Sequence, residues 1–143
     1  MARASILAFE PAHLADLDPP VFDRTQLRRF ASAYRAAGPA FTLVQEGRAL
    51  GCGGLLVEGD RAQAWAFLSE TLRRRPMLLH RTVRRALPAL IAHYGLTSVS
   101  AEAHEDFAAA RRWLERLGFR QVETIPQFAG STENYARYRL WVL

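Results

Sequence analysis

Lysine is absent from this sequence. All 19 basic residues are arginine, and they outnumber the 14 acidic residues, so the formal net charge is +5. Two explanations stay open. A GC-rich genome encodes arginine in place of lysine, and net charge alone says little about partners. Alternatively, the arginines bind anions, because the planar guanidinium fork matches the oxygens of phosphates and carboxylates.

Cysteine is nearly absent, since Cys52 is the only one. One cysteine excludes an intrachain disulfide and a cysteine zinc cage, and the four histidines show no metal-binding spacing, so we predict no metal site. No stretch approaches the ~20 apolar residues of a membrane span, and no apolar leader core follows Met1. We therefore expect a soluble protein of the cytoplasm.

The sequence also lacks internal repeats and low-complexity segments. Its 143 residues are 50% apolar and 23% charged, which is ordinary for a globular protein. Domains cluster at roughly 100–150 residues. Residues 1–143 are therefore predicted to form a single domain.

The first half of the chain predicts a short strand, two helices and three strands in a row. The helices are expected at 11–17 and from Asp23, a candidate N-cap, to Gly38. Alternating apolar residues predict strands at 5–9, 41–45, 49–57 and 61–69. The turns at 46–48 and 58–60 join the last three strands into an antiparallel meander.

The second half predicts a long helix, a strand, a second helix and two strands. The long helix covers 76–94, and Pro88 inside it is expected to kink or divide it. Its apolar face is predicted from five residues at helical spacing: Leu79, Val83, Leu87, Leu90 and Tyr94. A strand at 97–103, a helix at 105–117 ended by Gly118, and strands at 119–125 and 134–143 complete an α/β pattern.

Two local motifs, together with this order of elements, resemble the GNAT acyltransferase superfamily. One is the hairpin from Glu46 to Leu55, in which glycines follow a short turn. The other is Ala110 to Phe119, Ala-Arg-Arg-Trp-Leu-Glu-Arg-Leu-Gly-Phe, which is similar to the family's last helix and the strand after it. The resemblance implies a mixed, mostly antiparallel sheet flanked by helices, and acetyl-CoA as cofactor.

The chain from Trp65 to Leu143 also resembles small GNAT-like proteins encoded by bacteriophages. The shared features are Trp65 late in the third meander strand, an arginine-rich long helix and the Trp-Leu-x-x-Leu-Gly-Phe sequence from Trp113 to Phe119. Some of these proteins are virion or virion-assembly components. The resemblance therefore implies protein partners in a virion, and packaging from the host cytoplasm.

The sequence departs from the family where the chemistry is expected. The family places Arg/Gln-x-x-Gly-x-Gly/Ala before the long helix, and its backbone N–H groups bind the CoA pyrophosphate. The matching stretch, Arg73 to Leu78, holds neither glycine, and Pro76 has no backbone N–H. The family's tyrosine acid is replaced by Leu114, and an asparagine seven residues earlier by Phe107.

The resemblance still implies a set of candidate site residues. Backbone N–H groups around Phe67, Leu68 and Ser69 would hold pantetheine, while the guanidinium groups of Arg73, Arg74 and Arg75 would neutralise phosphates. Glu70 or Glu102 would accept a proton from an amine. The alternative interpretation is a solvated basic loop with two exposed strand-end acids.

Other conspicuous residues are interpreted as structural. Cys52 is expected to be a buried, inert thiol, and His104 a loop or cap residue. The three glycines at 51, 53 and 54 indicate a bulge or a close backbone approach. Trp65 and Phe67 are expected in the core or an interface.

Two hypotheses for function follow. In the first, the chain keeps the GNAT fold with a degenerate acetyl-CoA site and is a virion or virion-assembly component without ordinary catalysis. In the second, it is an acyl-CoA-dependent N-acetyltransferase acting on an amine. Nucleic-acid binding ranks last, because no helix-turn-helix or RNA-binding aromatic signature accompanies the charge.

Overall fold

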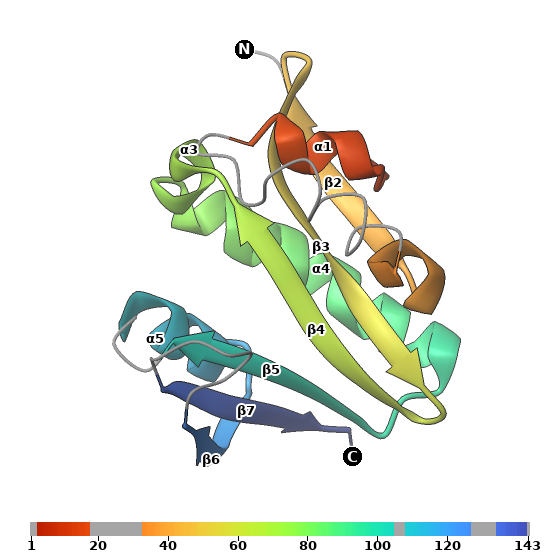
Figure 1. The fold of residues 1–143 in the computed structure, drawn as a ribbon, viewed down its shortest axis with the longest axis vertical. Helices are drawn as coiled ribbons and strands as arrows, with labels where there is room; N and C mark the ends of the chain where they lie inside the picture. Colours follow the sequence, from red (N-terminus) through yellow and green to blue (C-terminus); the bar gives the residue numbers. More distant parts are fainter. Residues whose placement is uncertain (1–2, 18–32, 105–107, 127–133, 143) are drawn as a thin grey trace. The chain divides into compact units, whose positions relative to one another are not determined.

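The computed structural model describes residues 3–17, 33–104, 108–126 and 134–142 (Figure 1). Apart from α3, the elements follow the predicted order: β1 (Ser5–Ala8), α1 (Pro11–Ala15), β2 (Ala40–Gln45), β3 (Arg48–Glu58), β4 (Arg61–Leu68), α3 (Glu70–Arg73), α4 (Pro76–Tyr94), β5 (Ser98–His104), α5 (Ala108–Arg116), β6 (Arg120–Ile125) and β7 (Tyr135–Trp141). The strands form one seven-stranded sheet, ordered β1-β2-β3-β4-β5-β7-β6. The chain is thus a single α/β domain with a mostly antiparallel sheet flanked by helices, as predicted.

Within this domain the chain contacts form two compact units. The first unit contains residues 1–57 and 64–79, and the second contains residues 58–63 and 80–143. Each candidate residue is therefore described inside its own unit.

In the first unit, glycines allow close backbone approach, as predicted. The β2–β3 turn uses Glu46 and Gly47, both with positive φ (53° and 74°). A Cβ atom on Gly54 would lie 2.2 Å from the carbonyl oxygen of Pro39, which is too close for any side chain. The β2–β3 register shifts between Leu43 and Val44, so the hairpin also carries an irregularity.

Two apolar clusters form the core of this unit. Phe9, Leu14 and Cys52 belong to one, against which Trp65 and Phe67 pack. The other contains Leu43, Leu50 and Leu72, with Leu68 packed against it. Because Phe67 and Leu68 are neighbours on a strand, their side chains point to opposite faces and each reaches a different cluster. Trp65 and Phe67 are core residues, as expected.

The second unit is organised around β5 and β7. β5 pairs in parallel with β4 over Ser98–Ser100 and Arg61–Gln63, and antiparallel with β7 over its whole length. β7 in turn pairs with β6. The most deeply buried side chains of these strands are Val99, Ala136 and Tyr138. The centre of this unit therefore depends on the last strand in the chain.

Gly118 ends α5 as predicted. Its φ is 100°, a conformation that favours glycine, and the N–H of Phe119 donates to the carbonyl of Leu114 at 3.0 Å. Phe119 is 3% exposed, so the turn directs it into the core. The Gly-Phe motif thus has a packing role.

α4 differs from the prediction at two positions. Pro88 does not divide the helix, which runs from Pro76 to Tyr94 with Pro88 inside it and exposed. The proline has no N–H to donate to the carbonyl of Arg84, one turn earlier. Tyr94 is 38% exposed instead of completing the apolar face, because it is the last residue before Gly95 (φ 62°) turns the chain.

The short helix α3 was not predicted. The third meander strand ends at Leu68, and Ser69 begins the helical turn instead of extending the strand. The expected N-cap at Asp23, the residue Phe107 and the loop containing Gly130 lie outside the described residues.

Candidate functional site

Most of the candidate residues lie in one short segment of the first unit, where β4 ends and α4 begins. This segment, Phe67–Arg75, holds seven of them: Phe67, Leu68, Ser69, Glu70, Arg73, Arg74 and Arg75. Ser69 fixes its course. The Ser69 N–H donates to the carbonyl of Leu50 at 2.9 Å, and its Oγ accepts from the N–H of Leu72 at 3.2 Å. Ser69 is therefore the N-cap of α3.

Four consecutive backbone donors of this segment, from Leu72 to Arg75, are used inside the turn. Besides the Leu72 N–H, the N–H of Arg73 donates to Ser69 (3.1 Å), that of Arg74 to Glu70 (3.2 Å) and that of Arg75 to Leu72 (2.9 Å). Pro76 then offers no N–H. Three residues of the stretch that matches the pyrophosphate cradle, Arg73 to Arg75, thus direct their N–H groups to the protein's own oxygens.

The three arginines have different surroundings. Arg75 is half-buried, and its Nη1 donates to Gln45 Oε1 on β2 at 2.6 Å. Arg74 Nε lies 3.7 Å from Glu70 Oε1 across one turn, and Arg73 is exposed. Sequence reasoning missed the Arg75–Gln45 contact, because 30 residues separate the partners.

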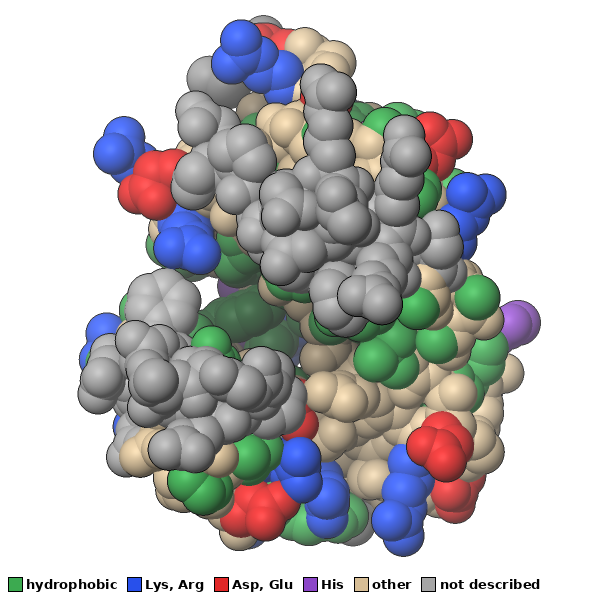
Figure 2. All heavy atoms as spheres, viewed as in Figure 1, with side chains coloured by type: hydrophobic (Ala, Val, Ile, Leu, Met, Phe, Trp, Pro, Cys, Tyr) green, Lys and Arg blue, Asp and Glu red, His purple; other side chains and the backbone are tan. Residues whose placement is uncertain are grey.

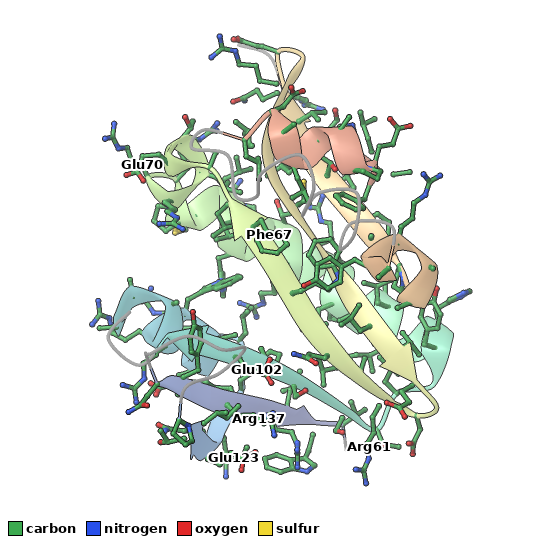
Figure 3. The ribbon with its side chains drawn as sticks, in the orientation of Figure 1. Arg61, Phe67, Glu70, Glu102, Glu123 and Arg137 are labelled. Atoms are coloured by element: carbon green, nitrogen blue, oxygen red, sulfur yellow. The ribbon has the colours of Figure 1, made fainter. Side chains whose placement is uncertain are left out.

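Glu70 lies in the first turn of α3 (Figure 3). Its side chain is 55% exposed, and that of Arg74 is 79% exposed. Surface pairs of this kind are worth about 0–1 kcal/mol. Glu70 is therefore accessible to a substrate and only loosely held.

Glu102 has a different environment in the second unit. Its side chain is 7% exposed, Oε1 accepts from Arg137 Nε at 3.0 Å, and Oε2 accepts from Gln63 Nε2 at 2.6 Å. Arg137 also pairs with Glu123, so Gln63, Glu102, Arg137 and Glu123 join β4, β5, β7 and β6 in one row. Figure 3 labels the last three of these residues. Both carboxylate oxygens of Glu102 are thus engaged with protein donors.

Leu114 stands at the position of the family's acid and has no proton to donate. Leu114 is 7% exposed and packs in the core. Tyr138 is fully buried, and its hydroxyl accepts from Arg111 Nε at 3.0 Å. The phenol of Tyr138 is therefore part of a structural contact.

Cys52 is buried, as predicted. Burial raises the pKa of its thiol from 9.0 to about 11, although the hydroxyl of Thr42, 3.6 Å from Sγ, opposes the shift. His13 Nδ1 lies 2.6 Å from that hydroxyl and accepts the Glu10 N–H at 3.1 Å. The histidine reaches threonine rather than sulfur, so it does not activate the thiol.

Among the described residues, no group of three or more His, Cys, Asp or Glu side chains could hold a metal ion. No helix in that part of the chain is long and apolar enough to cross a membrane. On the face drawn in Figure 2, arginines occur in separate places, several beside acidic side chains.

Comparison with solved structures identifies similar folds. The ribosomal-protein-S18-alanine N-acetyltransferase from Escherichia coli is 19% identical, with a TM-score of 0.78 over 98% of this chain and 94% of that one. Ard1 from Thermoplasma volcanium is 17% identical, with a TM-score of 0.79 over 98% of both chains. A GNAT-family acetyltransferase from Bacillus anthracis is 13% identical, with a TM-score of 0.73 over 99% of this chain and 98% of that one.

No protein-family model matches the chain, and no curated protein matches its sequence. At these identities the structural likeness shows the fold alone. The chain has the fold of GNAT acetyltransferases, as the order of its elements predicted.

Proposed function

We propose that this acetyltransferase-like chain has a degenerate acetyl-CoA site and works by binding a partner, without ordinary acetyl transfer. One observation carries the proposal. The backbone N–H groups from Leu72 to Arg75 all donate to oxygens within the segment or its cap. The pyrophosphate cradle implied by the family resemblance needs such groups to be available.

The energy of the turn explains why this matters. Freeing the N–H groups of Arg73, Arg74 and Arg75 breaks three hydrogen bonds, each worth about 0.5–1.5 kcal/mol net, or about 1.5–4.5 kcal/mol together. Millimolar affinity corresponds to about 4 kcal/mol of binding free energy. The free energy needed to open the turn is therefore comparable to the binding free energy of a cofactor with millimolar affinity.

The arginines do not restore the missing donors. Arg75 is held by Gln45, and Arg74 lies beside Glu70. To contact a phosphate, these side chains must first give up their present partners, Gln45 and Glu70. The residues present thus fit a CoA pyrophosphate poorly, and we derive no catalytic step through the cofactor.

The resemblance to phage-encoded proteins gives this proposal its specific form, a virion or virion-assembly component. The residues that carry it have packing roles here: Trp65 stacks on Tyr34 with ring centroids 4.8 Å apart, and Gly118 ends α5. Mass spectrometry of phage particles, purified from a host that encodes the chain, tests whether the chain is a virion component. The chain's absence from the particles and from their assembly intermediates would contradict it.

Calorimetric titration with acetyl-CoA tests the degenerate site. We expect a dissociation constant weaker than about 1 mM for the full chain. Micromolar binding that is lost in an Arg73→Ala and Arg74→Ala variant, and kept in Arg48→Ala, would overturn the proposal. Arg48 is a matched control because it is an exposed arginine at the start of β3, outside the segment.

An acyl-CoA-dependent N-acetyltransferase is the second candidate. The fold comparison over almost the whole chain and the exposure of Glu70 favour it. It assigns proton acceptance to Glu70 or Glu102 and phosphate contacts to Arg73–Arg75. Release of CoA from acetyl-CoA with a panel of amines, reduced by Glu70→Gln without loss of thermal stability, would support this candidate over the first.

A further inference from the structure

An apolar groove lies in the second unit, between the C-terminal half of α4, the end of α5 and the end of β7. Its volume is about 810 Å³, within the range of roughly 300–1,000 Å³ for ligand-binding clefts. The apolar walls are formed mainly by Leu87, Ile91, Leu96, Leu117, Leu140 and Trp141. The groove contains none of the residues of Phe67–Arg75.

One face of α4 forms a wall of this groove. Arg84, Pro88 and Ile91 follow one another at intervals of four and three residues, so they share one side of the helix, and Gly95 lies directly after its end. The opposite wall ends in Trp141 and Val142, which are 51% and 40% exposed. Adjacent exposed apolar side chains of this size mark binding surfaces, and tryptophan is enriched at interface hot spots.

The two charged residues that line the groove have the same sign. Arg84 and Arg116 are the charged residues that line it, and neither makes an ion pair within the described part of the chain. Arg139, which does not line the groove, has its guanidinium 5.9 Å from the centre of the Trp141 ring. The complementary occupant therefore carries carboxylates.

We propose that this groove binds an acidic amphipathic segment of a partner protein. Its apolar side chains occupy the groove, and its carboxylates pair with Arg84 and Arg116. A second copy of this chain fits less well, since a two-fold interface places the same arginines against one another. Nucleic acid would leave the apolar walls unused. The role of the groove does not depend on whether the Phe67–Arg75 segment binds acyl-CoA.

Selection from a random 16-residue peptide library against the full chain tests this inference, whatever the identity of the partner. We expect the enriched peptides to be net acidic, with apolar residues at helical spacing. Fluorescence anisotropy should then show that Arg84→Glu with Arg116→Glu weakens their binding by at least about tenfold. Ala92→Asp should weaken it as well, because Ala92 is exposed and lines the groove.

Matched changes elsewhere provide the control. Arg48→Glu with Arg61→Glu changes the net charge by the same amount as the groove variant, at exposed positions outside the groove. Its peptide affinity should stay within about twofold of the affinity of the unchanged chain. Circular dichroism melting confirms that all variants fold. Enrichment of no acidic peptides, or equal binding to the groove variants and the control, would overturn the proposal. Dimerisation in sedimentation that Ala92→Asp abolishes would assign the groove to a second copy instead.

Discussion

Replacing Arg137 by methionine tests the row of polar side chains across β4, β5, β7 and β6. Methionine retains an apolar stem but removes the donor to Glu102, whose side chain is 7% exposed. Hydrogen bonds to charged groups are worth about 1.5–3 kcal/mol, and the 32% exposure of Arg137 places this one in the middle of that range. We expect a loss of about 2 kcal/mol in the free energy of unfolding, or about 6–8 °C in Tm for a domain of this size.

Urea unfolding followed by circular dichroism measures this loss. Glu123→Gln is the matched control, because Glu123 contacts the same guanidinium but its side chain is 51% exposed, and it should cost at most about 1 kcal/mol. Combining Arg137→Met with Glu102→Gln should cost less than the sum of the two single changes, because the double variant leaves no buried charge unpaired. Equal costs for Arg137→Met and Glu123→Gln would refute the reasoning.

Four further predictions concern the first unit. Gly54→Ala should destabilise the fold more than Gly53→Ala in urea titrations, because the new Cβ atoms would meet backbone oxygens at 2.2 Å and 3.1 Å respectively. Ser69→Ala should cost about 1 kcal/mol by the same measurement, since it removes the cap of α3. Iodoacetamide at pH 8 should modify Cys52 slowly in the native chain and rapidly in urea, because burial keeps the thiol protonated. The raised pKa of Cys52 also makes the free energy of unfolding decrease as pH rises from about 9 to about 11, because the thiol loses its proton at lower pH in the unfolded chain than in the folded one. Cys52→Ala should lack this contribution to the decrease in stability.

Local patterns were sufficient to predict most elements of the fold. The meander, the glycine contacts and the end of α5 at Gly118 follow from alternation and from residues with restricted conformations. The helical turn α3 was missed because its signal is a single cap residue, Ser69, that also continues the alternation of β4. Tyr94 was misplaced because helical spacing alone does not show where a helix leaves the core.

The candidate site was less predictable, because its properties depend on distant partners. Glu102 is separated by 35 residues from Arg137 and by 39 from Gln63, so no local pattern reveals that both its oxygens are occupied. The same holds for Arg75 and Gln45. The missing glycines indicated a degenerate segment, but only the fold shows that its N–H groups are used internally.

The position of β7 has a consequence for how the chain folds during synthesis. β6 is made before β7, yet its neighbour in the sheet is β7, which also contributes the fully buried Ala136 and Tyr138. A nascent chain that ends before Tyr135 therefore holds β6 without a strand to pair with and leaves one whole side of β5 open. The second unit must wait for its last strand, and until then the exposed edges of β5 and β6 are surfaces on which chaperones or neighbouring nascent chains can act.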